Sequence, residues 1–436
     1  MFSRVNLLAV VFGLVAGSTP ALAADPVSVL FVGNSYTFGR VDPVMSYNAE
    51  NVRDLTRPGQ PGRPSFDNTV GSNAFEPHPW GGVPGIFKQL TVQAGLEYDV
   101  ASSARNAASL RGHMLNTNPA GWDLRGNLAL QTWDKVVLQE QSDEPLSLRP
   151  GLPSNPARFN NYTNKIAEYV KKGTLATYRE RDYYEGANNT EKTNNCVIIT
   201  GASSTTACNA QRGTADGLSS TFKLPVNRNA SASTEVFLYQ TWARPNLVTG
   251  AFVTVTDEDT GEVTRTATPA TTYFEDLESM TDELAVSYEE AFERPLDDGS
   301  VGFTDIAPVG EAFMRAVTEG VATRDMWAAD ATTDGLIDLW FDDGTHASKY
   351  GSYLSALTLF GTLTGIDPWS FGANEQAAAD LAISPHDAVK LQKVASDQLY
   401  ASGVPLVRLP CLHANPRATG AAQNNEGITT CGQGKR

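Results

Sequence analysis

The sequence predicts an α/β protein, a three-layer α/β/α sandwich built around a mostly parallel sheet. The main observation is that strand-like and helix-like segments alternate along the N-terminal half of the chain. Such alternation is typical of parallel strands joined by right-handed helical crossovers. A second observation is the continuous apolar run from Val27 to Val32, which suits a strand buried on both faces.

Three more segments complete the expected sheet: Tyr98 to Ala101, Trp133 to Gln139 and Glu235 to Trp242. Apolar residues at helical spacing predict the layers that cover it. The expected helices are Val83 to Ala94, Phe159 to Lys171, Leu277 to Phe292, Val309 to Thr318, Tyr350 to Leu363 and Asp387 to Ala401, the last capped by Ser384 and Pro385.

Several polar segments interrupt this pattern. Residues 145–232 are rich in Asn, Thr, Ser and Gly and are expected to form a long surface insertion, as is a shorter Pro/Gly-punctuated stretch from Val52 to Trp80. A further insertion at about 250–275 contains Phe252 to Thr266, which alternates around an Asp-Thr-Gly turn and predicts an exposed hairpin. We expect residues 24–436 to form one domain that ends in an irregular tail at about 403–436.

The first 23 residues have the pattern of a secretory signal peptide. Arg4 supplies a positive charge, Leu7 to Ala16 form a short apolar stretch, and Ala21-Leu22-Ala23 fits a cleavage site. No later apolar run approaches the length of a membrane span. The mature protein is therefore expected to be soluble and either periplasmic or secreted. The formal net charge of the full sequence, −16, argues against nucleic acid or anionic membrane surfaces as partners.

Four cysteines are present, an even number that in an exported chain indicates disulfides. We expect local pairing, Cys196 with Cys208 and Cys411 with Cys431. Zinc is the alternative, but no short Cys-x-x-Cys spacing and no pair of histidines at ligand spacing supports it. The acidic turn Asp257-Glu258-Asp259 lacks the ligand spacing of a calcium loop, so neither a metal nor a cofactor is expected.

Two motifs carry the chemistry. Ser35 follows the first strand in Gly33-Asn34-Ser35, where the carboxyl end of a parallel strand commonly meets a ligand. Far downstream, Asp343 precedes His346 by three residues, so one loop offers an imidazole base and a carboxylate to orient it. A serine that merely caps a helix and an exposed acidic loop are the alternative interpretations. Together the motifs provide a nucleophile, a base and an orienting acid.

With these motifs the chain resembles the GDSL, or SGNH, hydrolase superfamily. Gly-Asn-Ser-Tyr-Thr at Ser35 matches its first block, Asp-x-x-His at Asp343 and His346 matches its last block, and the order along the chain agrees. The Gly-x-Ser-x-Gly elbow of α/β-hydrolases is absent because position 37 is Thr. The resemblance implies a flavodoxin-like fold and a serine esterase that needs no cofactor.

The resemblance also implies an oxyanion hole, although the middle blocks match loosely. The backbone N–H groups of Ser35 and Ala107 are candidate donors, and the Asn106 side chain is an alternative to Ala107. A glutamine stands where the family uses asparagine. Gln139 and Gln141 are both candidates because alternate residues of a strand share a face. Asn34, Tyr36 and Trp242 are the expected substrate contacts. Trp242 could line a substrate groove together with Tyr239 and Arg244, since aromatic rings stack on sugars and arginine pairs with carboxylates; packing in the core and on the surface is the alternative for these three residues.

Ester hydrolysis through an acyl-Ser35 intermediate is therefore the function that the sequence predicts. Expected export and the resemblance favour a small-molecule or polysaccharide ester, in particular an acetyl ester on a carbohydrate. A lipase or small-ester hydrolase is the alternative among enzymes. A carbohydrate-binding protein without catalytic activity is the alternative from another class, because a fold does not fix a function.

Overall fold

A computed structural model describes most of the chain. The described residues are 25–40, 42–57, 78–117, 123–149, 151–152, 154–210, 217–249, 251–256, 263–268, 272–298, 301–328, 330–331 and 333–409. The expected signal peptide, the Asp257-Glu258-Asp259 turn and the Cys411–Cys431 pair lie outside these residues.

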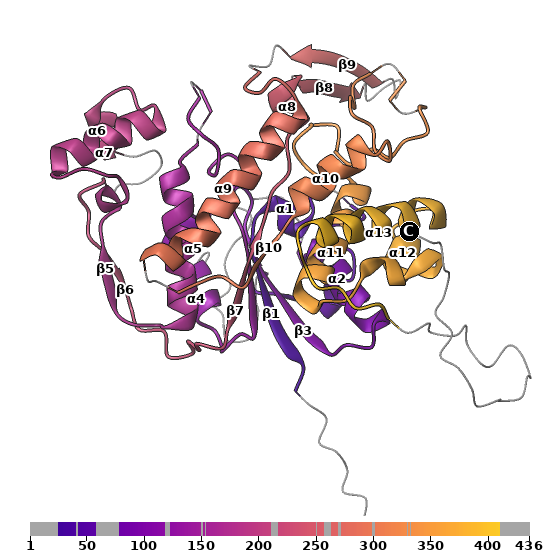
Figure 1. Ribbon diagram of the computed structural model, residues 1–436, viewed down its shortest axis with the longest axis horizontal. Helices are drawn as coiled ribbons and strands as arrows, with labels where there is room; N and C mark the ends of the chain where they lie inside the picture. The colour runs from indigo at the N-terminus through magenta and orange to yellow at the C-terminus, as the bar shows by residue number, and fades with distance from the viewer. Residues whose placement is uncertain are drawn as a thin grey trace, which may run out of the picture.

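A six-stranded sheet, with every neighbouring pair of strands parallel, forms the centre of the molecule (Figure 1). Its strand order is β10-β7-β4-β1-β3-β2. Parallel pairing puts the carboxyl ends of all six strands at one edge of the sheet. The strands are β1 Val27–Gly33, β2 Arg53–Asp54, β3 Tyr98–Ala104, β4 Lys135–Gln139, β7 Glu235–Tyr239 and β10 Asp305–Ala307.

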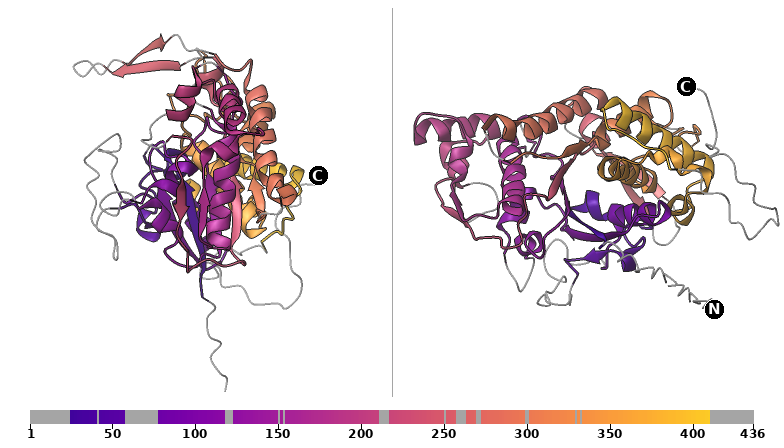
Figure 2. Two further views of the ribbon diagram at one scale, coloured as in Figure 1. Left: turned by 90° about the vertical axis from the view of Figure 1, so that its left-hand side faces the viewer. Right: turned by 60° about the horizontal axis from the view of Figure 1, so that its bottom comes forward.

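Helices cover both faces of the sheet, as Figures 1 and 2 show. On one side α2 packs on α11, and α11 packs on α13; on the other, α5 packs on α3 and α9. The bounds of these helices are α2 Gly82–Gln93, α3 Leu110–Leu115, α5 Pro156–Lys171, α9 Leu277–Asp298, α11 Lys349–Thr364 and α13 Pro385–Ala401. The predicted three-layer α/β sandwich is thereby confirmed.

The centre of β1 explains why the strand prediction succeeded. Val29, Leu30 and Phe31 are each 0% exposed, because β3 and β4 flank the strand and helices cover its two faces. A strand buried on both faces gains from apolar residues at consecutive positions, which removes the usual alternation. The Val27-to-Val32 run is thus the sequence signal of a central strand.

The remaining elements lie around this core. The expected hairpin is present as β8 with β9, and α10 coincides with its predicted range. The insertion at 145–232 holds more order than its composition suggested, including the β5–β6 pair and the helices α6 and α7. The other bounds are α1 Ser35–Phe38, η1 Ala49–Asn51, α4 Leu124–Leu128, β5 Ala176–Tyr178, η2 Glu180–Tyr183, α6 Asn189–Thr200, α7 Thr205–Ala210, β6 Phe222–Leu224, α8 Pro245–Val248, β8 Ala251–Thr256, β9 Val263–Thr268, α10 Val309–Thr318, η3 Pro368–Ser370, η4 Gly372–Asn374 and α12 Gln376–Asp380.

A disulfide joins Cys196 of α6 to Cys208 of α7, which confirms the first predicted pair. Both views agree that α6 and α7 lie at the opposite end of the molecule from α12 and α13 (Figures 1 and 2). No described helix is both long and apolar enough to cross a membrane.

Candidate active site

Ser35 begins the short helix α1 directly after β1. The side chain of Asn34 caps this helix, with its Oδ1 accepting a hydrogen bond from the Tyr36 N–H at 3.1 Å. The chain can turn here because position 33 is glycine: a Cβ there would overlap the Thr37 hydroxyl and the Gln139 amide. Ser35 is thus held at the carboxyl edge of the central strand, with 6% of its surface exposed.

The three predicted residues Ser35, His346 and Asp343 come together in a chain of hydrogen bonds. Ser35 Oγ lies 2.8 Å from His346 Nε2, and His346 Nδ1 lies 2.6 Å from Asp343 Oδ2. A carboxylate at Nδ1 favours the tautomer that carries its proton there, which leaves Nε2 free to accept from the serine hydroxyl. The arrangement can remove the serine proton, as nucleophilic catalysis requires.

The loop that holds His346 is shaped by the same carboxylate. Asp343 Oδ1 accepts from the backbone N–H groups of Thr345 at 2.8 Å and His346 at 2.9 Å. Burial alone would raise the pKa of Asp343, but these hydrogen bonds and the neighbouring imidazole outweigh it, so the pKa lies below its usual value. The carboxyl group is therefore ionised at neutral pH. Gly344, with φ at +62°, lets the loop turn beneath the Trp327 ring.

An aromatic stack lies behind the imidazole. Tyr36 stacks on Trp242 with ring centroids 4.0 Å apart, Trp242 stacks on Phe313 at 4.8 Å, and the Trp242 indole N–H donates to Thr345 O at 3.1 Å. Trp242 is 0% exposed and Tyr36 is 5% exposed. The two rings fix the His346 loop against α1 and α10. Their expected contact with substrate stays a prediction.

Asn34 also has a structural role, and its expected contact with substrate stays a prediction. It is 3% exposed, its Oδ1 caps α1, and its Nδ2 donates to Ala108 O at 3.0 Å. Both polar ends of the amide are occupied inside the protein. This bonding has a physical cause, because the strand-to-helix turn needs a cap at the position beside the nucleophile.

The turn Arg105–Ala108 carries the expected donor at Ala107. The Ala108 N–H donates to Arg105 O at 3.0 Å, and Ala107 has a φ of +54°. A positive φ at the third residue of such a turn is a geometry that favours glycine. Among the described residues, the N–H groups of Ser35 and Ala107 have no hydrogen-bond acceptor. Both remain available to a ligand.

The two glutamine candidates are differently placed. Gln139 is 0% exposed: its Oε1 accepts from the Asn34 N–H at 2.9 Å and the Thr37 hydroxyl at 3.0 Å, and its Nε2 donates to Glu140 O. Gln141 is partly exposed and bonds to Asp143 through both amide atoms. Since β4 ends at Gln139, the strand period does not place the two side chains on one face. Gln139 supports the nucleophile turn from within.

Two buried groups beside the site were not expected from sequence. His113 is 0% exposed and its Nε2 donates to Gly33 O at 2.8 Å; burial lowers its pKa to about 4. Glu140 is 1% exposed and accepts two backbone N–H groups. A histidine on a short helix and an acid between two glutamines give no periodic signal, so only the fold reveals them.

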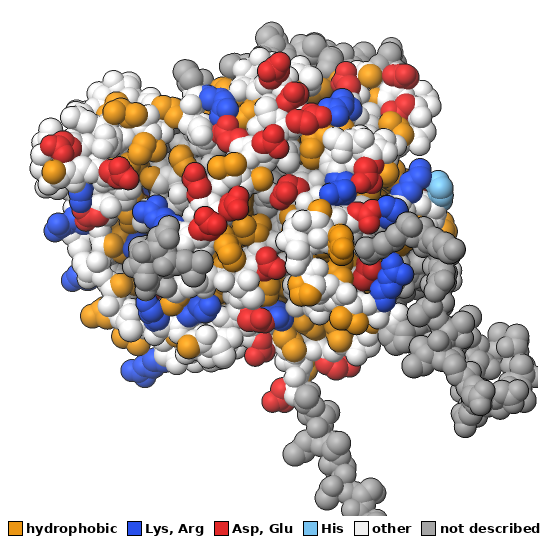
Figure 3. Space-filling model, viewed as in Figure 1, with side chains coloured by type: hydrophobic (Ala, Val, Ile, Leu, Met, Phe, Trp, Pro, Cys, Tyr) orange, Lys and Arg blue, Asp and Glu red, His pale blue; other side chains and the backbone are white. Residues whose placement is uncertain are grey.

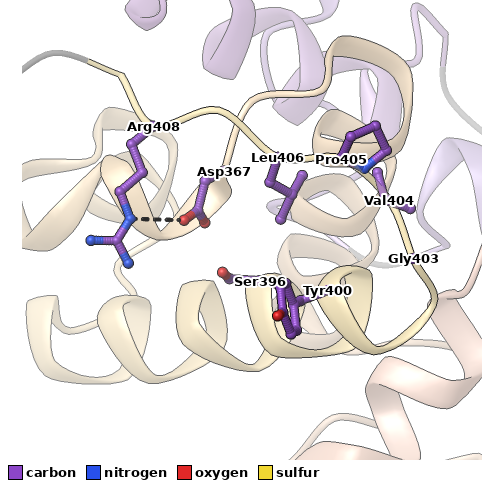
Figure 4. A pocket seen from close by; sticks show the side chains of 8 residues that line it. All are labelled: Asp367, Ser396, Tyr400, Gly403, Val404, Pro405, Leu406 and Arg408. Carbon is purple, nitrogen blue, oxygen red and sulfur yellow. Dashed lines mark hydrogen bonds and ion pairs between the residues drawn. The ribbon is translucent and has the colours of Figure 1, made fainter. Parts of the chain in front are cut away.

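A pocket of about 300 Å³ lies elsewhere, between the end of α13 and the segment that follows it (Figure 4). Arg408 and Asp367 form an ion pair at its wall, 3.3 Å apart. It shares no residue with the serine site. Within the described part of the chain, no cluster of three or more His, Cys, Asp or Glu could hold a metal ion.

Fold and site together define the class: an α/β sandwich with a hydrogen-bonded Ser–His–Asp chain at the carboxyl edge of its parallel sheet. Similar solved structures include one described as a candidate SGNH hydrolase from Slackia heliotrinireducens, with 16% identity, a TM-score of 0.35 and coverage of 78% of this chain and 100% of that one. A DUF4886 family protein from Bacteroides uniformis ATCC 8492 has 12% identity, a TM-score of 0.37 and coverage of 88% and 98%.

A third similar structure, described as a candidate GDSL-like lipase from Parabacteroides merdae ATCC 43184, has 13% identity, a TM-score of 0.36 and coverage of 78% and 96%. Two of the three descriptions name an SGNH or a GDSL-like hydrolase, the group that the motifs of this chain resemble. No family model and no curated protein matches the sequence.

Proposed function

We propose that the protein is a serine ester hydrolase that works through an acyl-Ser35 intermediate. The observation that carries this proposal is the unbroken chain from Ser35 Oγ through both nitrogens of His346 to Asp343. A serine hydroxyl is a weak nucleophile unless an adjacent base removes its proton. The chain supplies that base and the carboxylate that orients it.

The reaction follows from these positions. Ser35 Oγ attacks the ester carbonyl while His346 Nε2 takes the hydroxyl proton, and Asp343 stabilises the imidazolium that forms. His346 then gives the proton to the leaving alkoxide, which departs as the alcohol and leaves acyl-Ser35. A water molecule loses its proton to His346 and attacks the acyl carbonyl; the proton returns to Ser35 Oγ as the acid is released.

The negative charge that develops on the carbonyl oxygen of the substrate has to be stabilised by hydrogen-bond donors. We assign this role to the N–H groups of Ser35 and Ala107, which have no acceptor among the described residues. Gln141 is the remaining candidate for a third donor. Gln139 is not assigned this role because its amide is occupied inside the fold.

For the substrate we propose an acyl ester, most simply an acetyl ester on a small molecule or a polysaccharide, met outside the cytoplasm. The motif resemblance and the signal-peptide pattern at residues 1–23 support this choice. We further propose that residues 24–436 work as one hydrolase domain. Lipase activity and binding without catalysis are the competing outcomes of the test below.

The test compares p-nitrophenyl esters of increasing chain length with an acetylated polysaccharide, for the wild type, Ser35→Ala and Ser46→Ala. Ser35→Ala is expected to lower kcat by at least about 10³-fold, because the residues of a triad act as a unit. Ser46 is exposed and away from β1, so its variant is the matched control. A fluorophosphonate should label Ser35. Labelling of another serine would show that the nucleophile is not Ser35. A preference for long acyl chains would indicate a lipase.

A further inference from the structure

We propose that Glu140 is a positioning residue for the Ala107 donor: its carboxyl group holds the start of α3 and, through it, the turn Arg105–Ala108. The inference rests on the proposed ester hydrolysis. It gives a role to a buried acid that the mechanism above leaves unused.

The contacts of Glu140 place it directly beside the turn. Its Oε1 accepts from the Leu110 N–H at 2.8 Å and from the Gln141 N–H at 2.7 Å. Leu110 is the first residue of α3, three positions beyond Ala107. One carboxyl oxygen therefore ties the segment that follows β4 to the chain that leaves the turn.

The other side of the turn is tied to the end of β1. The Arg105 N–H donates to Gly33 O at 3.1 Å, and Asn34 Nδ2 donates to Ala108 O at 3.0 Å. The nucleophile turn thus fixes one side of the donor segment and Glu140 fixes the other. Within the turn itself only the bond from the Ala108 N–H to Arg105 O closes the loop.

External anchors matter here because the turn is strained. Ala107 has a φ of +54°, a region that a residue with a Cβ enters at a conformational cost. Without the anchors the segment can relax toward a negative φ, which would rotate the Ala107 N–H away from its present direction. An oxyanion donor works only when it is preorganised, so a small rotation is costly for the rate.

The bonding of Glu140 fits this role better than a role in an ion pair. Both hydrogen bonds found for its carboxyl group come from backbone N–H groups. The nearby Arg111 and Arg158 instead pair with Glu180. Burial, with a further contribution from Glu144, raises the pKa of Glu140 well above its usual value, so a neutral acceptor of the same shape can replace it.

The experiment compares Glu140→Met, Glu140→Gln and Glu144→Gln in the full-length protein. Methionine keeps the approximate shape and removes the acceptor, whereas glutamine keeps an oxygen that can accept both N–H groups. Glu144 is a neighbouring buried acid for which no bond to residues 105–110 is found in the described structure, so its variant controls for the replacement of a buried acid near the turn. Two measurements are made: kcat and KM with p-nitrophenyl acetate, and amide hydrogen exchange at Ala108 and Leu110.

For Glu140→Met we expect kcat to fall about 10- to 100-fold with KM within about threefold, because one misplaced donor affects mainly the transition state. Exchange at Ala108 and Leu110 should become at least about tenfold faster. Glu140→Gln should restore both properties, and Glu144→Gln should leave both within about threefold of the wild type. A rise in KM alone, equal losses in all three variants, or unchanged exchange in Glu140→Met would overturn the inference.

The two proposals can fail separately. If the wild type hydrolyses no ester and fluorophosphonate does not label Ser35, the proposed function is wrong. Hydrogen exchange does not depend on turnover, so it still decides whether Glu140 holds the turn. If exchange responds as expected while kcat does not change, the positioning role is overturned and ester hydrolysis stands.

Discussion

At the scale of single residues, Asp343 performs two tasks with two oxygens. Oδ2 holds the imidazole of His346, while Oδ1 accepts the backbone N–H groups of Thr345 and His346 and so shapes the loop. An amide at this position can keep only part of this bonding, because one of its two polar atoms is a donor. The orientation and the tautomer of His346 therefore depend on a carboxylate here.

Asp343→Asn should consequently fold but lose about three orders of magnitude in kcat, because the amide cannot stabilise the imidazolium. The measurement is steady-state hydrolysis of p-nitrophenyl acetate, with circular dichroism to check the fold. Asp342→Asn is the matched control, since it makes the same change at the neighbouring exposed position, whereas Asp343 bonds to His346 Nδ1. A large loss of kcat in Asp342→Asn together with an unchanged kcat in Asp343→Asn would refute the assignment of Asp343 as the residue that orients His346.

His113 makes stability depend on pH. Burial lowers the pKa of His113 to about 4 from the ordinary value of 6.5. The unfolded chain therefore binds a proton at this histidine below pH 6.5, whereas the folded protein binds one only below about pH 4. Its contribution to stability is complete above pH 6.5 and is lost as the pH falls through this window. Between pH 7 and pH 5 the free energy of unfolding should drop by about 2 kcal/mol from this group.

Urea unfolding at the two pH values measures this drop. His113→Gln should remove most of it, because a glutamine amide can donate to Gly33 O without titrating. The exposed His386 on α13 provides the control, since His386→Gln should leave the pH dependence as in the wild type. Identical pH profiles for the wild type and His113→Gln would contradict the assignment.

Sequence patterns could predict Ser35, Asp343 and His346 because each has a local signature: the end of an apolar strand, or a three-residue spacing on one loop. They could not predict the roles of Gln139 and Trp242. Those roles depend on which neighbours surround an amide or an indole, and such neighbours come from segments about 100 residues away.

At the scale of elements, the stack of Tyr36, Trp242 and Phe313 connects three parts of the fold. Tyr36 belongs to α1, Trp242 follows β7, and Phe313 belongs to α10. The Trp242 N–H to Thr345 O bond attaches the His346 loop to this stack. The packing of the sandwich is therefore coupled to the position of the base.

Trp242→Phe should preserve the stacking but lose this hydrogen bond. We expect about 1–2 kcal/mol of destabilisation and about a tenfold lower kcat, because Thr345 O is left without its partner. Thermal unfolding and p-nitrophenyl acetate kinetics provide the two readouts. Trp133 is also buried, but its indole N–H has no partner in the described structure, so Trp133→Phe should lower stability without lowering kcat. Equal kcat values in the two variants would argue against the coupling.

Element prediction succeeded where apolar periodicity is strong and failed where it is weak. The strands β2 and β10 have two and three residues, too few to show a period. The helix α6 is rich in Asn and Thr and has only Thr193 and Cys196 buried, so its sequence resembles a loop. Its order comes from side-chain caps and the disulfide.

At the scale of the whole molecule, acidic side chains are spread over the face drawn in Figure 3, in keeping with a formal net charge of −16. Such a surface repels other polyanions and favours neutral or cationic substrates at long range. The α6–α7 unit lies at one end of this body, joined to it through the β5–β6 pair (Figure 1).

Removing the disulfide should therefore separate stability from activity. In the chain-entropy model a disulfide across a sequence separation of 12 contributes about 3 kcal/mol to the free energy of unfolding. We expect most of this stabilisation to act on the α6–α7 unit. The double variant Cys196→Ser with Cys208→Ser should be cut faster in residues 189–210 by limited proteolysis, while kcat stays within about twofold. A large loss of kcat or of Ser35 labelling would show that this unit contributes to the site.

The separation of 311 positions between Ser35 and His346 also sets the order in which activity can arise during synthesis. The nucleophile leaves the ribosome with β1, and its base follows only after a further 311 positions have been translated. A nascent chain therefore lacks the catalytic base until position 346 has been translated. Any product of premature termination before this position lacks the base as well. The serine is therefore activated only after the segment that carries His346 has been made.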